Sequence, residues 1–465
     1  EALVPLLAGL VWLGVAFDAG LPSGLLPALP GLLLVGGGVP GFLLRGDPRL
    51  AQLVGFGGLL GLLFALPGIF LAGPLQGLVW LLLSAAAFAA AGAMSVRQEP
   101  HVEDVPLPQP GLRLSAEVAA DDAMLGFMLL SFPNLSASDH ARAAAELESA
   151  LGLFGEKGWL EKPRLYHAAP PPLEKPSLVS RRTRSIAFEH LCFESGYEPH
   201  PEEPGRERWL GYGANRSAHA WLLRHDDPGR PWLIAIHGYQ MGSPAIDLRA
   251  LQAQRFHAEL GMNVLLPVLP LHGPRKKARV SGIGYISSDF MDSIHAEAQA
   301  MWDLRRMLGW IRAEGATRIG VAGLSLGGYQ TALLATLDDG LACAIAGIPA
   351  TDFARLVQRH APPLEVGEAR ALGFDMDTAR QVLRVVSPLA LEPRLPRERR
   401  ALFGAVSDLL VSPDQVRDLW RHWEKPRIVW YQGGHMSFPF HAPVRALVDE
   451  TLREAGLVAE ATRRS

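Results

Sequence analysis

Charged side chains are almost absent from the first 96 residues, which contain five of them: Glu1, Asp18, Arg45, Asp47 and Arg49. Four apolar runs lie in this part of the chain, at about residues 2–17, 21–44, 50–73 and 75–96. Each run approaches or exceeds the roughly 17 to 25 residues that a helix needs to cross a bilayer. We therefore expect residues 1–97 to form an all-α transmembrane region of about four helices.

The positions of the arginines predict how this region is oriented. Arg45 and Arg49 lie between the second and third runs, and Arg97 follows the fourth run, so two spans separate the cationic sites. Because cationic loops stay on the cytoplasmic side, we expect an integral membrane protein whose catalytic part is cytoplasmic. The second run contains four prolines and a Gly-Gly-Gly sequence, so a three-span topology that exports the catalytic part is the alternative.

Charge and cysteine content exclude several classes of partner and chemistry. The formal net charge is -3, which produces no general attraction to nucleic acid, so we expect no nucleic-acid partner. The two cysteines, Cys192 and Cys343, are too few for a disulfide framework and lie in apolar runs. They are typical of buried, reduced thiols, which agrees with a cytoplasmic catalytic part.

A linker and a small helical insert are predicted over residues 98–177. Residues 98–114 are rich in proline, which favours extended backbone. Residues 139–154 place their apolar side chains on one helical face, and Ser138 precedes them as the expected N-cap. We expect this helix to pack on the catalytic domain, with a position against the membrane interface as the alternative.

Residues 178–465 alternate short apolar runs with longer amphipathic ones, which predicts the strands and helices of an α/β domain. The strands are expected at residues 219–223, 232–237, 263–267, 318–323, 342–348, 401–406 and 427–431. An amphipathic helix is expected over residues 292–314, covering the sheet. Residues 351–400 interrupt the alternation with charged, helical sequence, which suggests a lid inserted between two strands.

The strongest motif is Gly323-Leu-Ser325-Leu-Gly327, which follows a predicted strand and precedes a helical sequence. A serine in this G-x-S-x-G pattern occupies a sharp strand-to-helix turn that exposes its Oγ. The turn leaves no space for side chains two residues to either side, so glycine is required at both positions. We therefore expect Ser325 to be a catalytic nucleophile.

With this motif, the chain resembles the α/β-hydrolase superfamily over about residues 178–460. The resemblance implies a doubly wound, mostly parallel sheet with a helical lid insertion. The sequence His237-Gly238-Tyr239 is similar to the family's strand that ends in His-Gly, whose following loop contributes to the oxyanion hole. It implies that the oxyanion hole consists of the backbone amides of Tyr239 and Leu326, with a structural role for His237.

The resemblance also implies an acid and a base. Residues 401–413 resemble the strand and loop that carry the acid, for which we expect Asp408, with Asp414 as the alternative. We expect His435, after the 427–431 strand, to be the base, with His441 as the alternative. The chain order Ser, Asp, His is the order that this fold uses.

No metal-site spacing and no phosphate-binding glycine loop occur in the sequence, so we expect neither a metal nor a cofactor. A basic run over residues 393–400 is expected to be a solvated surface, with an anionic lipid headgroup contact as the alternative.

The sequence thus predicts a membrane-anchored serine hydrolase that cleaves acyl esters through an acyl-enzyme intermediate. The expected partners are a small-molecule or lipid acyl ester, with the lipid-like ester favoured, and the membrane lipid bilayer. Two alternatives remain: a serine peptidase or amidase of the same fold, and a non-catalytic membrane-tethered binding scaffold. Acyl-chain length, headgroup and oligomeric state depend on the shape of the pocket and stay open.

Overall fold

Contacts divide the chain into two compact units. The structure, a computed structural model, describes residues 3–42, 47–131, 135–227 and 229–458. Unit 1 comprises Glu1–Pro133, Gly404–Asp414 and Trp430–Val444. Unit 2 comprises Asn134–Phe403, Gln415–Val429 and Arg445–Ser465. The segments that contain Asp408 and His435 therefore belong to the same unit as the N-terminal helices, whereas the sequence predicts boundaries near residues 97 and 177.

Within the described residues, nine strands form one mixed, mostly parallel sheet in the order β1-β2-β3-β5-β4-β6-β7-β8-β9. Their bounds are Ser177–Thr183 (β1), Ile186–Glu194 (β2), Ser217–Leu223 (β3), Trp232–Ile236 (β4), Asn263–Val268 (β5), Ile319–Leu324 (β6), Cys343–Gly347 (β7), Arg400–Ala405 (β8) and Arg427–Tyr431 (β9). The first four strands in this order pair antiparallel. The pairs from β5 through β4, β6 and β7 to β8 are parallel. The fold is therefore α/β, as the alternation of apolar runs predicts.

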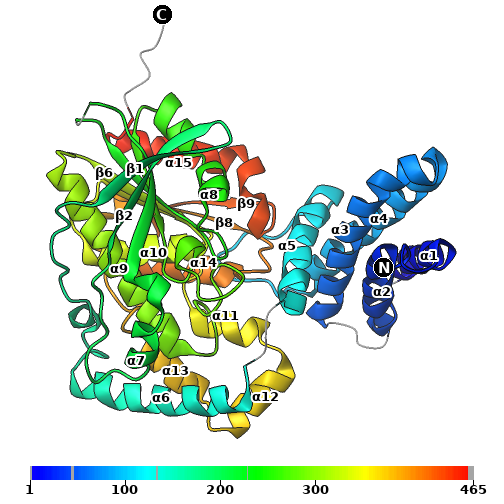
Figure 1. The fold of residues 1–465 in the computed structure, drawn as a ribbon, viewed down its shortest axis with the longest axis horizontal. Coiled ribbons are helices and arrows are strands. Elements are labelled where there is room, and N and C mark those ends of the chain that lie inside the picture. The colour runs from blue at the N-terminus through cyan, green and yellow to red at the C-terminus, as the bar shows by residue number, and fades with distance from the viewer. Residues whose placement is uncertain (1–2, 43–46, 132–134, 228, 459–465) are drawn as a thin grey trace, which may run out of the picture. The chain divides into compact units, whose positions relative to one another are not determined.

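Helices of the α/β part alternate with these strands along the chain (Figure 1). Their bounds are Ala137–Glu156 (α6), Arg206–Leu210 (α7), Pro244–Ala250 (α8), Phe290–Ala313 (α9), Leu326–Leu337 (α10), Phe353–His360 (α11), Pro363–Ala371 (α12), Met376–Leu383 (α13), Pro413–His422 (α14) and Ala442–Glu454 (α15). Helix α10 packs on β4, β6 and β7 and against α9. Helices α11 to α13 lie between β7 and β8, in the stretch where the sequence suggests a lid.

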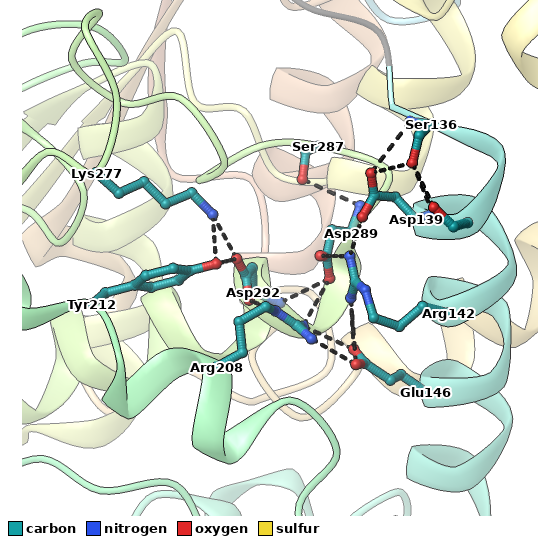
Figure 2. A network of polar contacts seen from close by, with 11 residues as sticks. Ser136, Asp139, Arg142, Glu146, Arg208, Tyr212, Lys277, Ser287, Asp289 and Asp292 are labelled. Atoms are coloured by element: carbon teal, nitrogen blue, oxygen red, sulfur yellow. Dashed lines mark hydrogen bonds and ion pairs between the residues drawn. The ribbon is translucent and has the colours of Figure 1, made fainter.

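A network of ion pairs attaches helix α6 to the rest of unit 2, as Figure 2 shows. Arg142 of α6 donates to Asp289 over 2.9 Å, and Arg208 of α7 pairs with Glu146 of α6 over 2.6 Å. Arg208 also contacts the buried Asp292 of α9, 2.9 Å away. Helix α6 thus packs on the α/β part through charged groups that α7 and α9 share.

The N-cap of α6 is Ser136, two residues before the predicted Ser138. The Oγ of Ser136 accepts from the Asp139 amide over 3.2 Å, and the Asp139 carboxylate accepts from the Ser136 amide over 3.3 Å. This reciprocal capping box satisfies two amides at the helix start. A carboxylate at residue 139 makes Ser136 the better cap, because Ser138 has no acidic residue three positions later.

Five helices form the N-terminal part of unit 1, where they lie side by side (Figure 1). Their bounds are Leu3–Ala19 (α1), Leu25–Gly38 (α2), Pro48–Leu71 (α3), Pro74–Gln98 (α4) and Leu112–Ser131 (α5). Helices α3 and α4, with 24 and 25 residues, are long and apolar enough to cross a membrane. Helix α1 has 17 residues and α2 only 14, because α2 ends shortly before Pro40. The described residues thus contain two candidate spans, whereas the sequence predicts about four. Arg45 lies outside the described residues.

Small residues let the helices of unit 1 approach each other closely. A Cβ at Gly58 of α3 would lie 3.0 Å from the Cα of Phe88 in α4. The indole N–H of Trp12 in α1 donates to the buried Oγ of Ser84 in α4 over 3.0 Å. Small interfacial residues and buried hydrogen bonds are the usual means by which helices associate in a bilayer.

Candidate active site

Ser325 lies on a sharp turn between β6 and α10. Its backbone has φ 57° and ψ -114°, a strained conformation for a residue other than glycine. The surroundings maintain this conformation, because the Ser325 amide donates to the carbonyl of Gly347 over 2.9 Å and the Tyr329 amide donates to the carbonyl of Ser325 over 3.0 Å. The turn leaves Ser325 half-buried between the mostly buried strand β6 and the fully buried helix α10.

The glycines on either side of Ser325 have no space for a side chain. A Cβ at Gly323 would lie 2.0 Å from the carbonyl oxygen of Gly327. A Cβ at Gly327 would lie 2.1 Å from the carbonyl oxygen of Ile236 in β4. Any larger residue would separate β6 from α10, or α10 from β4. The glycine pattern is thus a steric requirement of this turn.

The two predicted oxyanion-hole residues, Leu326 and Tyr239, lie next to the Ser325 turn. Leu326 is buried and is the first residue of α10, where the backbone amides have no partner within the helix. Tyr239 follows Gly238, at which a Cβ would lie 3.6 Å from the Cβ of Ser325. The loop that carries Tyr239 therefore runs directly beside the serine.

His237 directly follows β4 and is fully buried. Its Nδ1 lies 2.8 Å from the Gly238 carbonyl, and its Nε2 accepts from the Leu269 amide over 3.1 Å. These contacts hold the segments that follow β4 and β5.

Asp408 and His435 form a buried pair in unit 1. Asp408 follows β8, and His435 begins the 3-10 helix His435–Phe440 after β9. The Nδ1–H of His435 donates to Oδ2 of Asp408 over 2.6 Å, and the other oxygen of Asp408 accepts from the Val411 amide over 2.8 Å. Both side chains are almost completely buried. This contact orients the imidazole and leaves its Nε2 to face the opposite direction.

The environment of His435 favours the protonated imidazole. Burial alone lowers the pKa of His435, but the charge of Asp408 and the hydrogen bond to it outweigh this effect. The charge of Asp121 acts in the same direction, so the pKa of His435 lies above the ordinary value of 6.5. The pair thus has the electrostatics of a base that must accept a proton and hold it briefly.

The alternative acid and base have other contacts. Asp414 lies in the first turn of α14 and accepts a hydrogen bond from the Oγ of Ser412. The Nε2 of His441 lies 2.9 Å from a carboxylate oxygen of Glu117 in α5. The structure therefore brings together Asp408 and His435 of unit 1, whereas Ser325, Leu326 and Tyr239 belong to unit 2.

Asp121 is a residue that the sequence analysis did not single out. It lies on α5, is completely buried, and accepts hydrogen bonds from the backbone amides of His435 and Leu409. A signal was present in the sequence, because Arg113, Glu117 and Asp121 follow each other at intervals of four residues and so share one face of a helix.

Metal ligands do not gather anywhere in the described part of the chain: it contains no group of three or more His, Cys, Asp and Glu side chains placed to hold a metal ion.

Two mycobacterial proteins are similar to this chain, while no family model matches it. The chain is 41% identical over 358 residues to the uncharacterized protein MT2702 of Mycobacterium tuberculosis (strain CDC 1551 / Oshkosh), which covers 77% of this chain and 86% of that protein. It is 40% identical over 358 residues to the uncharacterized protein Rv2627c of strain ATCC 25618 / H37Rv, with the same coverage.

Solved structures with a similar arrangement include two acetyl xylan esterases. The enzyme from Paenibacillus sp. R4 has a TM-score of 0.45 and 17% identity, and the match covers 65% of this chain and 93% of that one. Acetyl xylan esterase 1 from Thermoanaerobacterium sp. JW/SL YS485 has a TM-score of 0.42 and 15% identity, and the match covers 63% and 98% of the two chains.

Proposed function

The chain belongs to the same family as the Mycobacterium tuberculosis proteins MT2702 and Rv2627c, and we propose that it is a membrane-anchored serine hydrolase that cleaves acyl esters. In this proposal Ser325 is the nucleophile, His435 the general base and Asp408 the acid that orients the base. The observation that carries the proposal is the buried hydrogen bond of 2.6 Å between His435 and Asp408, two residues that follow neighbouring strands.

The order of the strands supports the grouping of these residues. Ser325 follows β6, Asp408 follows β8 and His435 follows β9, and these strands occur in one sheet in the order β6-β7-β8-β9. The carboxyl ends of parallel strands open at the same edge of a sheet, where α/β proteins bind their ligands. The positions of the three residues after strands of one sheet therefore support the proposed roles.

The proposed reaction has two steps. Ser325 Oγ attacks the acyl carbon while its proton passes to Nε2 of His435, and the carbonyl oxygen becomes an oxyanion beside the amides of Leu326 and Tyr239. The intermediate collapses when the alcohol leaves with the proton from His435, and Ser325 keeps the acyl group. Water then attacks the acyl-enzyme with the same proton transfers, which releases the acid and restores the serine.

Membrane anchoring is supported by the outer surface of α1–α4. Large apolar side chains there are exposed by half or more, as in Leu10 (52%), Leu66 (53%) and Leu82 (59%). A soluble protein rarely exposes so many apolar side chains on neighbouring helices. We therefore propose that these helices form the anchor, with α3 and α4 as its spans. After alkaline carbonate extraction the full chain should remain with the membrane, and release into the supernatant would contradict the anchor.

The orientation of the anchor is proposed from Arg49 and Arg97, which border the candidate spans and place the catalytic part in the cytoplasm. A single cysteine introduced near residue 100 should resist an impermeant maleimide in intact cells and react after lysis. Labelling in intact cells would place the catalytic part outside.

Substrate class is tested with p-nitrophenyl esters of increasing chain length and with the matching anilides. We expect the purified full chain, in detergent micelles, to hydrolyse esters with a kcat/KM that rises with chain length, because a membrane location favours lipid-like acyl groups. Faster cleavage of the anilides would move the proposal to an amidase, and absence of hydrolysis of every compound would contradict it.

A further inference from the structure

Helix α5 of unit 1 contacts both loops that carry the proposed acid and base. Two neighbouring carboxylates of this helix, Asp121 and Asp122, are buried, with exposed fractions of 0% and 1%. Buried carboxylates are costly unless hydrogen bonds compensate for lost water, so each must have partners. The two side chains have different partners, which lie in the loops for Asp121 and in α4 for Asp122.

Asp121 contacts the backbone of both catalytic loops. Its Oδ2 accepts from the His435 amide over 2.6 Å and from the Leu409 amide over 3.2 Å. Its Oδ1 accepts from the Met436 amide over 3.1 Å. Leu409 directly follows Asp408, so one carboxylate binds the chain at the proposed acid and at the proposed base. Hydrogen bonds to a charged acceptor are roughly twice as strong as those between neutral groups.

The glycine before His435 is required by this carboxylate. A Cβ at Gly434 would lie 2.7 Å from Oδ2 of Asp121 and 2.9 Å from its Cγ. A Cβ at Gly433 would lie 2.6 Å from a carboxylate oxygen of Glu117, one turn earlier on α5. The Gly433-Gly434 sequence therefore allows the loop to lie directly against the polar face of α5.

Close packing makes α5 a rigid support. A Cβ at Gly92 of α4 would lie 1.9 Å from the carbonyl oxygen of Ser115, and one at Gly126 of α5 would lie 2.4 Å from the carbonyl oxygen of Gln52 in α3. Side chains on packed helices hold a site more exactly than side chains on loops do.

We propose that Asp121 is a positioning residue of the active site, whose carboxylate holds His435 and Asp408 in the geometry in which the imidazole accepts the proton of Ser325. The inference rests on the proposed function and adds to it a residue of α5. Asp121 acts through the two loops and is not itself in contact with the reacting atoms.

The charge of Asp121 has a second effect on the same site. Burial and the charge of Asp408 raise the pKa of Asp121, while the charge of His435 and the backbone hydrogen bonds lower it, so that it lies at about 7. The titratable groups around it are Asp408 and His435 on the loops, Tyr431 on β9 and Asp122 on α5 itself. An ionised Asp121 stabilises the imidazolium of His435, because opposite charges attract strongly in a buried site.

Asp122 provides a matched control. It is as buried as Asp121, but both of its oxygens lie 2.9 Å from the Oγ of Ser95 in α4, which donates to them. Asp121→Asn and Asp122→Asn therefore make the same carboxylate-to-amide change at neighbouring buried positions, and only the first changes the contact with the catalytic loops.

The experiment measures kcat, KM and the pH profile of p-nitrophenyl butyrate hydrolysis by the full chain in detergent micelles. Asp121→Asn should lower kcat by roughly 100-fold with little change in KM, the size expected from a slight misplacement of reacting groups. The acidic limb of its profile should move to lower pH, because His435 loses a neighbouring negative charge. Asp122→Asn should keep the kcat and the acidic limb of the unmodified protein.

Asp121→Glu distinguishes the effect of the carboxylate's position from the effect of its charge. It also replaces the asparagine variant as the test if that variant does not fold. It keeps the charge but displaces the oxygens, so kcat should fall while the acidic limb stays in place. Equal kcat and equal acidic limbs in the variants at 121 and 122 would overturn the role of Asp121 while the proposed function stands. Hydrolysis that survives Ser325→Ala would overturn both.

Discussion

The serine turn and the acid-base loops are held by two different kinds of contact. Around Ser325, glycines at positions 323 and 327 let backbone segments of β6, α10 and β4 touch, and hydrogen bonds between backbone groups hold the turn. Around His435, the backbone amides bind a buried carboxylate from α5, 314 residues earlier in the chain. The turn depends on the absence of side chains, and the loops depend on the presence of one.

This difference predicts how each region loses its conformation. Steric contacts between backbone segments are lost only when the elements separate, whereas a hydrogen-bonded loop shifts when a single acceptor is changed. We therefore expect the conformation of the serine turn to be either intact or lost as a whole. The geometry of the loops around His435 should instead change gradually with charge and pH.

The largest effect is expected from Ser325→Ala, which removes the proposed nucleophile and leaves the turn intact. Ester hydrolysis should fall by a factor on the order of 10⁶, the scale of nucleophile loss in serine hydrolases. The melting temperature should stay close to that of Ser185→Ala, a control on an exposed turn. Hydrolysis equal to that of the control would show that the reaction does not use Ser325.

The next largest loss of activity is expected from Asp408→Asn, a substitution in one of the two loops that carry the proposed acid and base. Loss of the charge that orients His435 should lower kcat by about 10⁴-fold, as for triad acids generally. Asp414→Asn, in the first turn of α14, should change kcat far less. The reverse ranking of the two variants would make Asp414 the acid.

The smallest effect concerns pH and affects only the loops, because the serine turn carries no group that titrates near neutrality. Asp408 and Asp121 both face His435 and outweigh the effect of burial, so its pKa is above 6.5. The base must be neutral to accept a proton, so kcat/KM should fall as the pH drops through a midpoint above 6.5. A midpoint below 6.5 would mean that burial dominates at His435.

Local sequence was sufficient for the strands β3 to β9 and for the Ser325 turn. These strands are short apolar runs, and the glycines of the turn act within a few residues of the serine. The hairpin β1–β2 escaped prediction because β1 is exposed along most of its length and so has no apolar pattern to detect.

Local sequence does not predict contacts between segments that are far apart in the chain. Asp121 binds a backbone amide 315 positions away. The spacing of Arg113, Glu117 and Asp121 indicates a polar helix face, but it does not indicate which segment contacts that face. Hydropathy similarly predicts about four spans because it counts apolar residues, whereas the length of α2 depends on where its backbone leaves the helical conformation.

Labelling with a fluorophosphonate probe tests whether Ser325 is a nucleophile activated by His435. We expect the full chain in detergent micelles to be modified on Ser325, as located by peptide mass spectrometry. Labelling should be lost in Ser325→Ala, strongly slowed in Asp408→Asn and unchanged in Ser185→Ala. An unlabelled full chain, or modification at another serine, would show that Ser325 is not an activated nucleophile.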